Sequence, residues 1–218
     1  MTTTNFQATS TYADIQGILD LTYSTARNTA GSVSTGSIPY IGQRYKSTAP
    51  NKGYYVFRAF LAFDTSAIGT DVVSQVNLKL TLTNDSSATD FDVQIVKCDW
   101  SGTYPIDSGN METAYDNCLS SALDDSILRN TSGVSNNTQY TSGNLSTSWI
   151  NRSGITYYAI MSSLDRNNTA PTGIDYMAFY QQGAATEAYR PVLTVTYAAG
   201  GGASVVPVIM NSYRQRRS

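Results

Sequence analysis

The sequence predicts an all-β protein, a jelly-roll-like antiparallel β-sandwich with long loops and a C-terminal tail. Short segments in which apolar and polar residues alternate recur along the chain, and no long stretch keeps a 3.6-residue period. Tyr is abundant, with 16 residues against 6 Phe, and Thr and Ser are frequent. Tyr and Thr favour strands, whereas Ser, Asn, Asp and Gly supply turns. At 218 residues and 41% hydrophobic, the chain can bury the core of one large domain.

The clearest strand covers residues 54–63. Its two faces are both apolar: Phe57, Ala59, Leu61 and Phe63 alternate with Val56, Phe60 and Ala62. Such a strand is expected at the centre of a sheet, covered on each side. Arg58 interrupts one face and needs a buried partner, for which Asp64 or another loop carboxylate is the candidate.

The other expected strands are mostly half-solvated. Residues 73–82 place Val76, Leu78, Leu80 and Leu82 on one face, and residues 91–97 place Phe91, Val93 and Ile95 inward. Further strands are expected at 155–161, 176–180 and 192–197.

Two segments, 25–51 and 99–147, are polar and are expected to be long loops that bind a ligand or pack against a neighbouring subunit. Leu119, Leu123 and Ile127 are spaced by four and predict a two-turn helix within the second segment. Another short helix is expected from Trp149 to Gly154.

The composition argues against an enzyme. The chain has no histidine, which excludes Ser-His-Asp and Cys-His catalysis and His-based metal sites. It has two cysteines, only two glutamates and no phosphate-binding glycine motif. No apolar run approaches the ~18–20 residues that span a bilayer, so no membrane span is expected. The first ten residues have neither a basic nor an apolar region, so we expect no Sec-type signal peptide.

Two motifs carry a family resemblance. Residues 57–68 (FRAFLAFDTSAI) with 76–80 (VNLKL) resemble the R-x-x-L-x-F-D-x-S-x-I … A-x-L-x-L signature of the DNRLRE-type domain, through Arg58, Leu61, Phe63 and Asp64. Residues 189–197 resemble that family's closing R-P-x-L-x-V-x-Y strand, through Arg190 and Pro191. The family is similar to carbohydrate-binding modules of family ninety-six. The resemblance covers residues 57–197 and implies a jelly-roll β-sandwich.

Members of that family occur in secreted polysaccharide-active enzymes, bacterial surface proteins and phage structural proteins. We expect the chain to begin at its own Met1 without a signal peptide. Its FDTSAI motif resembles the form of the signature found in phage structural proteins. We therefore expect a non-enzymatic virion structural protein, a phage capsid-decoration, fibre or tail component, made in the host cytoplasm and released by lysis. The alternative is a glycan-binding module or adhesin of a bacterial surface or extracellular filament.

The C-terminus suggests how the protein would assemble. A sandwich domain over 1–197 is followed by a Gly-rich linker, 198–204, and a docking tail, 205–218. All 16 acidic and 11 of the 14 basic residues precede the linker, so the body carries −5 and the tail +3. The expected contacts of the tail are the apolar Val205, Val206, Val208, Ile209 and Met210 and the basic Arg214, Arg216 and Arg217.

This tail would add to a sheet edge of another virion protein or another copy of the chain, with its arginines paired to acidic groups. The alternative is that it folds back on its own domain or frays. Three arginines are too few to predict nucleic-acid binding.

Five aromatic residues are candidates for binding surface polysaccharide: Trp100, Tyr104, Trp149, Tyr157 and Tyr158. The alternative, which we favour for the tryptophans, is that they plug the sandwich beneath loops.

No cofactor is expected, although two aspartate groups could collect a structural calcium ion. These groups are Asp85, Asp90 and Asp92, and Asp116, Asp124 and Asp125. Cys98 and Cys118 would close the loop between them if bonded, but cytoplasmic synthesis favours free thiols.

Overall fold

The computed structural model describes residues 1–9, 13–35 and 39–200, so the docking tail and residues 201–204 of the linker lie outside the described residues. Within them the chain is an antiparallel β-protein with a few short helices, which confirms the fold class. The strands are β1 (Thr2–Gln7), β2 (Ala13–Gly17), β3 (Ala30–Thr35), β4 (Tyr40–Lys46), β5 (Gly53–Asp64), β6 (Val72–Asp85), β7 (Asp92–Val96), β8 (Leu123–Asn130), β9 (Gln139–Thr141), β10 (Ile155–Ser162), β11 (Ile174–Phe179) and β12 (Val192–Ala198). The α-helices are α1 (Tyr23–Asn28), α2 (Met111–Ser120) and α3 (Ser163–Arg166), and the 3-10 turns are η1 (Ser66–Ile68), η2 (Ser101–Thr103), η3 (Thr147–Trp149) and η4 (Glu187–Tyr189).

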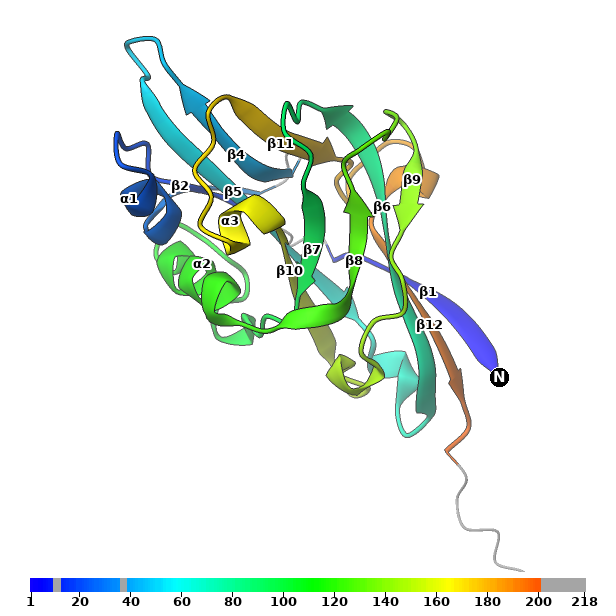
Figure 1. The fold of residues 1–218 in the computed structure, drawn as a ribbon. Coiled ribbons are helices and arrows are strands. Elements are labelled where there is room, and N and C mark those ends of the chain that lie inside the picture. The colour runs from blue at the N-terminus through cyan, green and yellow to red at the C-terminus, as the bar shows by residue number, and fades with distance from the viewer. Residues whose placement is uncertain (10–12, 36–38, 201–218) are drawn as a thin grey trace, which may run out of the picture.

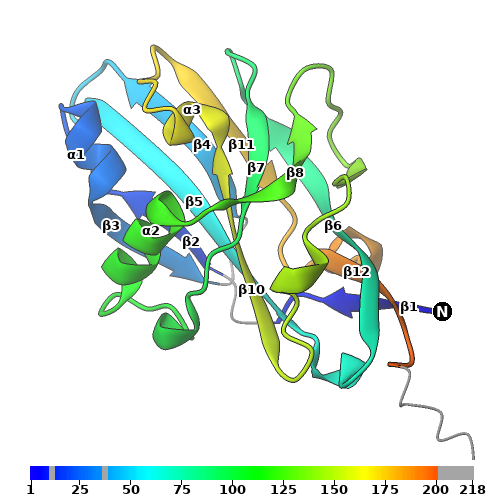
Figure 2. The same ribbon diagram turned by 60° about the horizontal axis from the view of Figure 1, so that its bottom comes forward.

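The strands form one hydrogen-bonded path, β1-β12-β6-β11-β4-β5-β10-β7-β8, with β2 and β3 added beside β5 and β9 beside β6. The path folds over so that β6, β12 and β1 face β5, β10 and β7 across a shared core (Figure 1). Neighbours such as β1 and β12 lie far apart in sequence, which is typical of a jelly-roll-like sandwich. The second view shows β5 crossing the molecule diagonally, with α1 and α2 on one side of it (Figure 2).

β5 is the central strand, as its two apolar faces predict. One edge pairs first with β4 and then with β10, and the other edge pairs with β2. Ten of its twelve residues are buried. The other five strands expected from alternation are also present, each bound lying within three residues of the expected one.

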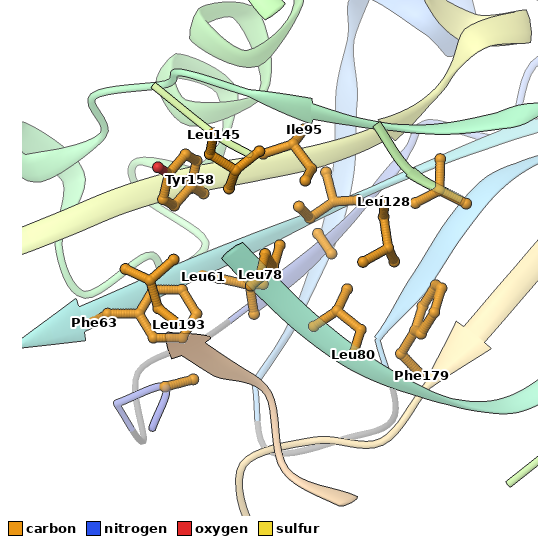
Figure 3. Close-up of a cluster of buried hydrophobic side chains, with 14 of the residues drawn as sticks. Leu61, Phe63, Leu78, Leu80, Ile95, Leu128, Leu145, Tyr158, Phe179 and Leu193 are labelled. Carbon is orange, nitrogen blue, oxygen red and sulfur yellow. The ribbon is translucent and has the colours of Figure 1, made fainter. Parts of the chain in front are cut away.

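Two apolar clusters flank β5. The larger cluster fills the space between the layers; in Figure 3, Phe63 of β5 lies beside Leu193 of β12, with Leu78 of β6 close by. Val76, Leu78, Leu80 and Leu82 belong to it, as do Phe91, Val93 and Ile95, so the expected facings are correct. The second cluster lies on the opposite face of β5 and β10, where α2 covers it.

Arg58 points to the same face of β5 as the second cluster and has no exposed surface. Its partner is Asp165 of α3 and not Asp64: Nε donates to Oδ2 at 2.7 Å and Nη2 to Oδ1 at 3.0 Å. The guanidinium also stacks on the Tyr115 ring, 3.8 Å from its centroid. Burial by itself lowers the pKa of Arg58, but the facing carboxylate of Asp165 outweighs this and raises it.

Asp64 instead lies at the exposed end of β5, where it accepts hydrogen bonds from the amide and hydroxyl of Ser66. These bonds lower the pKa of its carboxyl group. The two signature residues therefore have separate structural roles.

The two segments expected to be long loops contain regular secondary structure, so both predictions are wrong. Segment 25–51 contains most of α1 together with β3 and β4, and segment 99–147 contains α2, β8 and β9. Each of these strands has a polar face, because only part of each strand packs into the core and the rest lies at the surface of the protein. The helix expected from Leu119, Leu123 and Ile127 is wrong as well, since Leu123 and Ile127 belong to β8. Thr147–Trp149 is a 3-10 turn, so the helix expected from Trp149 to Gly154 is also absent.

Candidate functional site

A groove of about 300 Å³ opens on the sheet formed by β3, β2, β5, β4 and β11. Its lining combines aromatic, charged and small polar side chains: Asp14, Gln16, Ser32, Ser34, Tyr40, Arg44, Phe57 and Tyr176. We call it the aromatic groove. It lies on rigid strands, which hold a binding site more firmly than loops do.

Strand register brings these residues together. Phe57 of β5 lies opposite Gln16 of β2 and opposite Gly42 of β4, and Gly42 in turn lies opposite Tyr176 of β11. Cross-strand partners project from the same face of a sheet, so one row of side chains crosses the groove. Gly42 has a φ of 119°, and a Cβ there would lie 2.3 Å from the Asp175 carbonyl oxygen. This position therefore requires glycine, and the rings of Phe57 and Tyr176 on the two flanking strands meet with centroids 5.8 Å apart.

Three aromatic rings meet in the groove. The centroids of Tyr40 and Tyr176 are 5.5 Å apart, and each lies within 6 Å of Phe57, at 5.7 and 5.8 Å. Phe57 is buried and forms the floor, whereas Tyr40 is 36% exposed and Tyr176 is half-buried. The two tyrosines thus offer ring surface and hydroxyl groups to a ligand.

The polar groups of the groove carry both signs of charge. The Arg44 guanidinium lies over the Tyr55 ring, 4.2 Å from its centroid, in cation–π geometry. Asp14 of β2, buried to 95%, supplies a carboxylate across β5. Ser32 and Gln16 add smaller polar groups on the β2–β3 side. Apolar ring surface bordered by oriented donors and acceptors is the usual composition of a small-molecule site.

The prediction of glycan binding is wrong for two of the five aromatic residues, because these two have no exposed surface. Trp100 is fully buried, packs edge-on against Phe60 and donates from Nε1 to the Tyr158 carbonyl at 3.2 Å. Tyr158 is also fully buried, in the core between the layers. Trp100 is therefore a plug of the sandwich, the alternative favoured from the sequence.

The other three aromatics are half-buried and lie close together. Trp149 and Tyr157 line a second recess of about 350 Å³, and the Tyr104 ring lies 5.7 Å from that of Tyr157. We call this recess the tryptophan trough; its full lining is Asp99, Ser101, Ser148, Trp149, Ile150, Asn151, Ile155, Thr156 and Tyr157. Part of the expected aromatic platform is thus present, although without Trp100 and Tyr158.

The two aspartate groups do not gather into calcium sites: no group of three or more His, Cys, Asp or Glu side chains suited to a metal occurs among the described residues. Cys98 and Cys118 are both buried and unbonded, in agreement with the expectation of free thiols. Burial raises the pKa of Cys98 to about 11 and raises that of Cys118 further.

The aromatic groove was missed from the sequence, since half of it comes from the expected loop 25–51. A signal was present: Tyr40, Gly42 and Arg44 alternate with Ile41 and Gln43, the period-2 pattern of a strand with one functional face. Its partners in the groove come from β2, β3, β5 and β11, which only the fold brings together.

The signature residues at the end of the chain also have structural contacts. Arg190 donates from Nε to the Ala184 carbonyl at 3.1 Å, and the buried Pro191 accepts from the Ala8 amide at 3.0 Å. Arg190 therefore braces the loop before β12 from within, and Pro191 joins that loop to the segment after β1.

The chain matches no protein-family model, and no characterised protein shows significant similarity to it. The DNRLRE resemblance therefore stays a prediction. No helix among the described residues has the length and apolar character to cross a membrane.

Proposed function

We propose that this chain is a non-catalytic β-sandwich module that binds saccharide in the aromatic groove. The observation that carries the proposal is the composition of the groove: Tyr40 and Tyr176 pack on the Phe57 floor, and Arg44 and Asp14 line the same groove. The C–H faces of a pyranose pack against aromatic rings, and its hydroxyl groups hydrogen-bond to planar charged side chains. The groove offers both kinds of contact on one rigid sheet.

The groove also favours binding over cleavage. A glycosidase places two carboxylates about 5–9.5 Å apart across the scissile bond. Asp14 is the sole carboxylate among the described residues that line the groove. The chain has no histidine to act as a base instead. These features support a module that holds saccharide without turning it over.

The test is affinity electrophoresis of the whole chain in native gels that contain xylan, glucomannan, hydroxyethyl cellulose or dextran. We expect at least one polysaccharide to retard the wild type. Tyr176→Ala removes one ring of the groove, and Ser32→Trp fills it from an exposed position. Each should raise the Kd at least about tenfold, which corresponds to ~1.4 kcal/mol.

The matched control is Tyr189→Ala, which removes a half-buried tyrosine outside the groove and should leave retardation unchanged. Retardation by none of the four polysaccharides, or equal retardation of the groove variants and wild type, would overturn the proposal. Release of reducing ends or unsaturated sugars that depends on Tyr176 would show an enzyme instead.

The second candidate is the structural component of a virion or other assembly expected from the sequence. Its support is the apolar and basic segment 205–218 on a body of net charge −5, together with the edge strand β1. Thr2–Gln7 contains no charge and no proline, the residues that usually protect an edge from strand addition. Binding saccharide and taking part in an assembly are compatible in one protein.

A truncation after Gly200 tests the assembly role. If the tail docks on a neighbour, the shortened chain should remain folded and soluble but lose higher-order assembly in sedimentation velocity. A truncated chain that unfolds would show that the tail belongs to the domain's own core, and one that assembles like the wild type would exclude the tail as the link.

A further inference from the structure

The tryptophan trough is a second built recess, separate from the aromatic groove. The indole of Trp149 is half-buried and fixed in place, because its Nε1 donates to the Tyr157 carbonyl at 2.7 Å. Tyr157 stands next to it and is itself held by Trp100, with ring centroids 4.8 Å apart. Rings held in this way lose little conformational entropy when a ligand binds.

The rim of the trough is polar. Asp99, Ser101 and Ser148 are exposed around the two rings. The Asp99 carboxylate is oriented, since its Oδ1 accepts from the Ser101 amide at 2.9 Å. Half-exposed rings beneath a ring of hydroxyl and carboxylate groups repeat the chemistry of the aromatic groove, so the trough suits the same class of ligand.

The two recesses lie at different places on the central layer: the groove is centred on Phe57 of β5, and the trough lies at the first residues of β10. Phe57 of β5 forms the floor of the groove, while Tyr157 of the trough lies opposite Ala62 of β5. Phe57 and Ala62 are five residues apart and are therefore separated by about 17 Å along the strand. In Figure 2, β4 and β11 lie at one end of β5 and the lower end of β10 lies at the other.

From this geometry we infer that the protein is bivalent and cross-links two saccharide chains, one in the aromatic groove and one in the tryptophan trough. The inference rests on the proposed function of the groove. A single short chain cannot occupy both recesses, because about 17 Å of strand separates them. Two sites on one rigid body instead convert modest single-site binding into bridging and avidity.

The test is a bridging assay with the polysaccharide that retards the wild type most. Beads carrying this polysaccharide capture the protein, are washed, and are then offered the same polysaccharide labelled with fluorescein. Ser148→Trp fills the trough from an exposed position, and Ser32→Trp fills the groove. We expect the wild type to bridge, and each variant to be captured yet to bridge at least tenfold less label per captured molecule.

A mixture of the two blocked variants distinguishes bivalency from self-association. Each copy then has only one open recess, so the mixture should also fail to bridge if the two sites act within one molecule. Trp149→Ala is a second trough variant, and Tyr189→Ala should bridge like the wild type.

Full bridging by Ser148→Trp, restored bridging in the mixture, or no bridging by the wild type would each overturn the inference. These outcomes are separate from the proposed function, which is decided by the effect of the groove variants on retardation alone.

Discussion

The buried ion pair between Arg58 and Asp165 gives the sharpest prediction about stability. Asp165→Asn keeps the size of the side chain but removes its charge. The carboxylate faces two guanidinium groups, since Arg27 Nε also lies 3.2 Å from its Oδ1. The substitution therefore leaves Arg58 fully buried without a counter-ion and Arg27, with 13% of its side chain exposed, without its ion pair.

Removing one partner of a buried pair costs about 3–5 kcal/mol. Because Asp165 serves two cations, we expect a loss near the upper end, about 5 kcal/mol. Arg58→Met should cost less, about 3 kcal/mol, since Asp165 keeps Arg27 as a partner. In the double variant Arg58→Met/Asp165→Asn, both charges of the buried pair are removed, so neither is left without its partner. Its loss should therefore fall short of the sum of the two by about 2 kcal/mol.

The measurement is urea unfolding followed by circular dichroism, with the slope compared between variants. Asp64→Asn is the matched control, because it removes a carboxylate at the exposed end of the same strand and should cost below about 1 kcal/mol. An Asp165→Asn loss within 1 kcal/mol of this control, or additive losses in the double variant, would show that the buried pair is not the determinant of stability proposed here.

Three further predictions concern the core and the thiols. Phe63→Ala should cost about 3–5 kcal/mol in the same assay, since Phe63 has no exposed surface; a loss below about 1 kcal/mol would contradict its place in the core. At pH 8, Ellman's reagent should label Cys98 and Cys118 quickly only in denaturant, and fast labelling of the folded protein would show that they are accessible. The folded-state pKa of Cys98, about 11, exceeds its ordinary 9.0, so its contribution to stability is intact below pH 9 and is lost as the pH rises to 11. Unfolding free energy should thus fall more steeply over this range in the wild type than in Cys98→Ser, and parallel curves would refute the assignment.

The sequence by itself determined the strands that have an apolar face. Alternation is a local property, because every second side chain of a strand faces the same way, and it correctly placed β5, β6 and β7 with their core residues. It also indicated that Arg58 needs a buried partner. Composition correctly identified the all-β class.

Tertiary structure decided which residues meet. Asp165 lies 107 positions from Arg58, and no local pattern marks it as the partner in place of the nearby Asp64. β3 and β4 looked like loop because one face of each is polar, and that face lines the aromatic groove. Whether Trp100 packs inside or faces solvent depended on the cover supplied by α2 and β10. A groove built from five strands exists only when their registers are aligned, and register is set by long-range pairing and not by the sequence of any one strand.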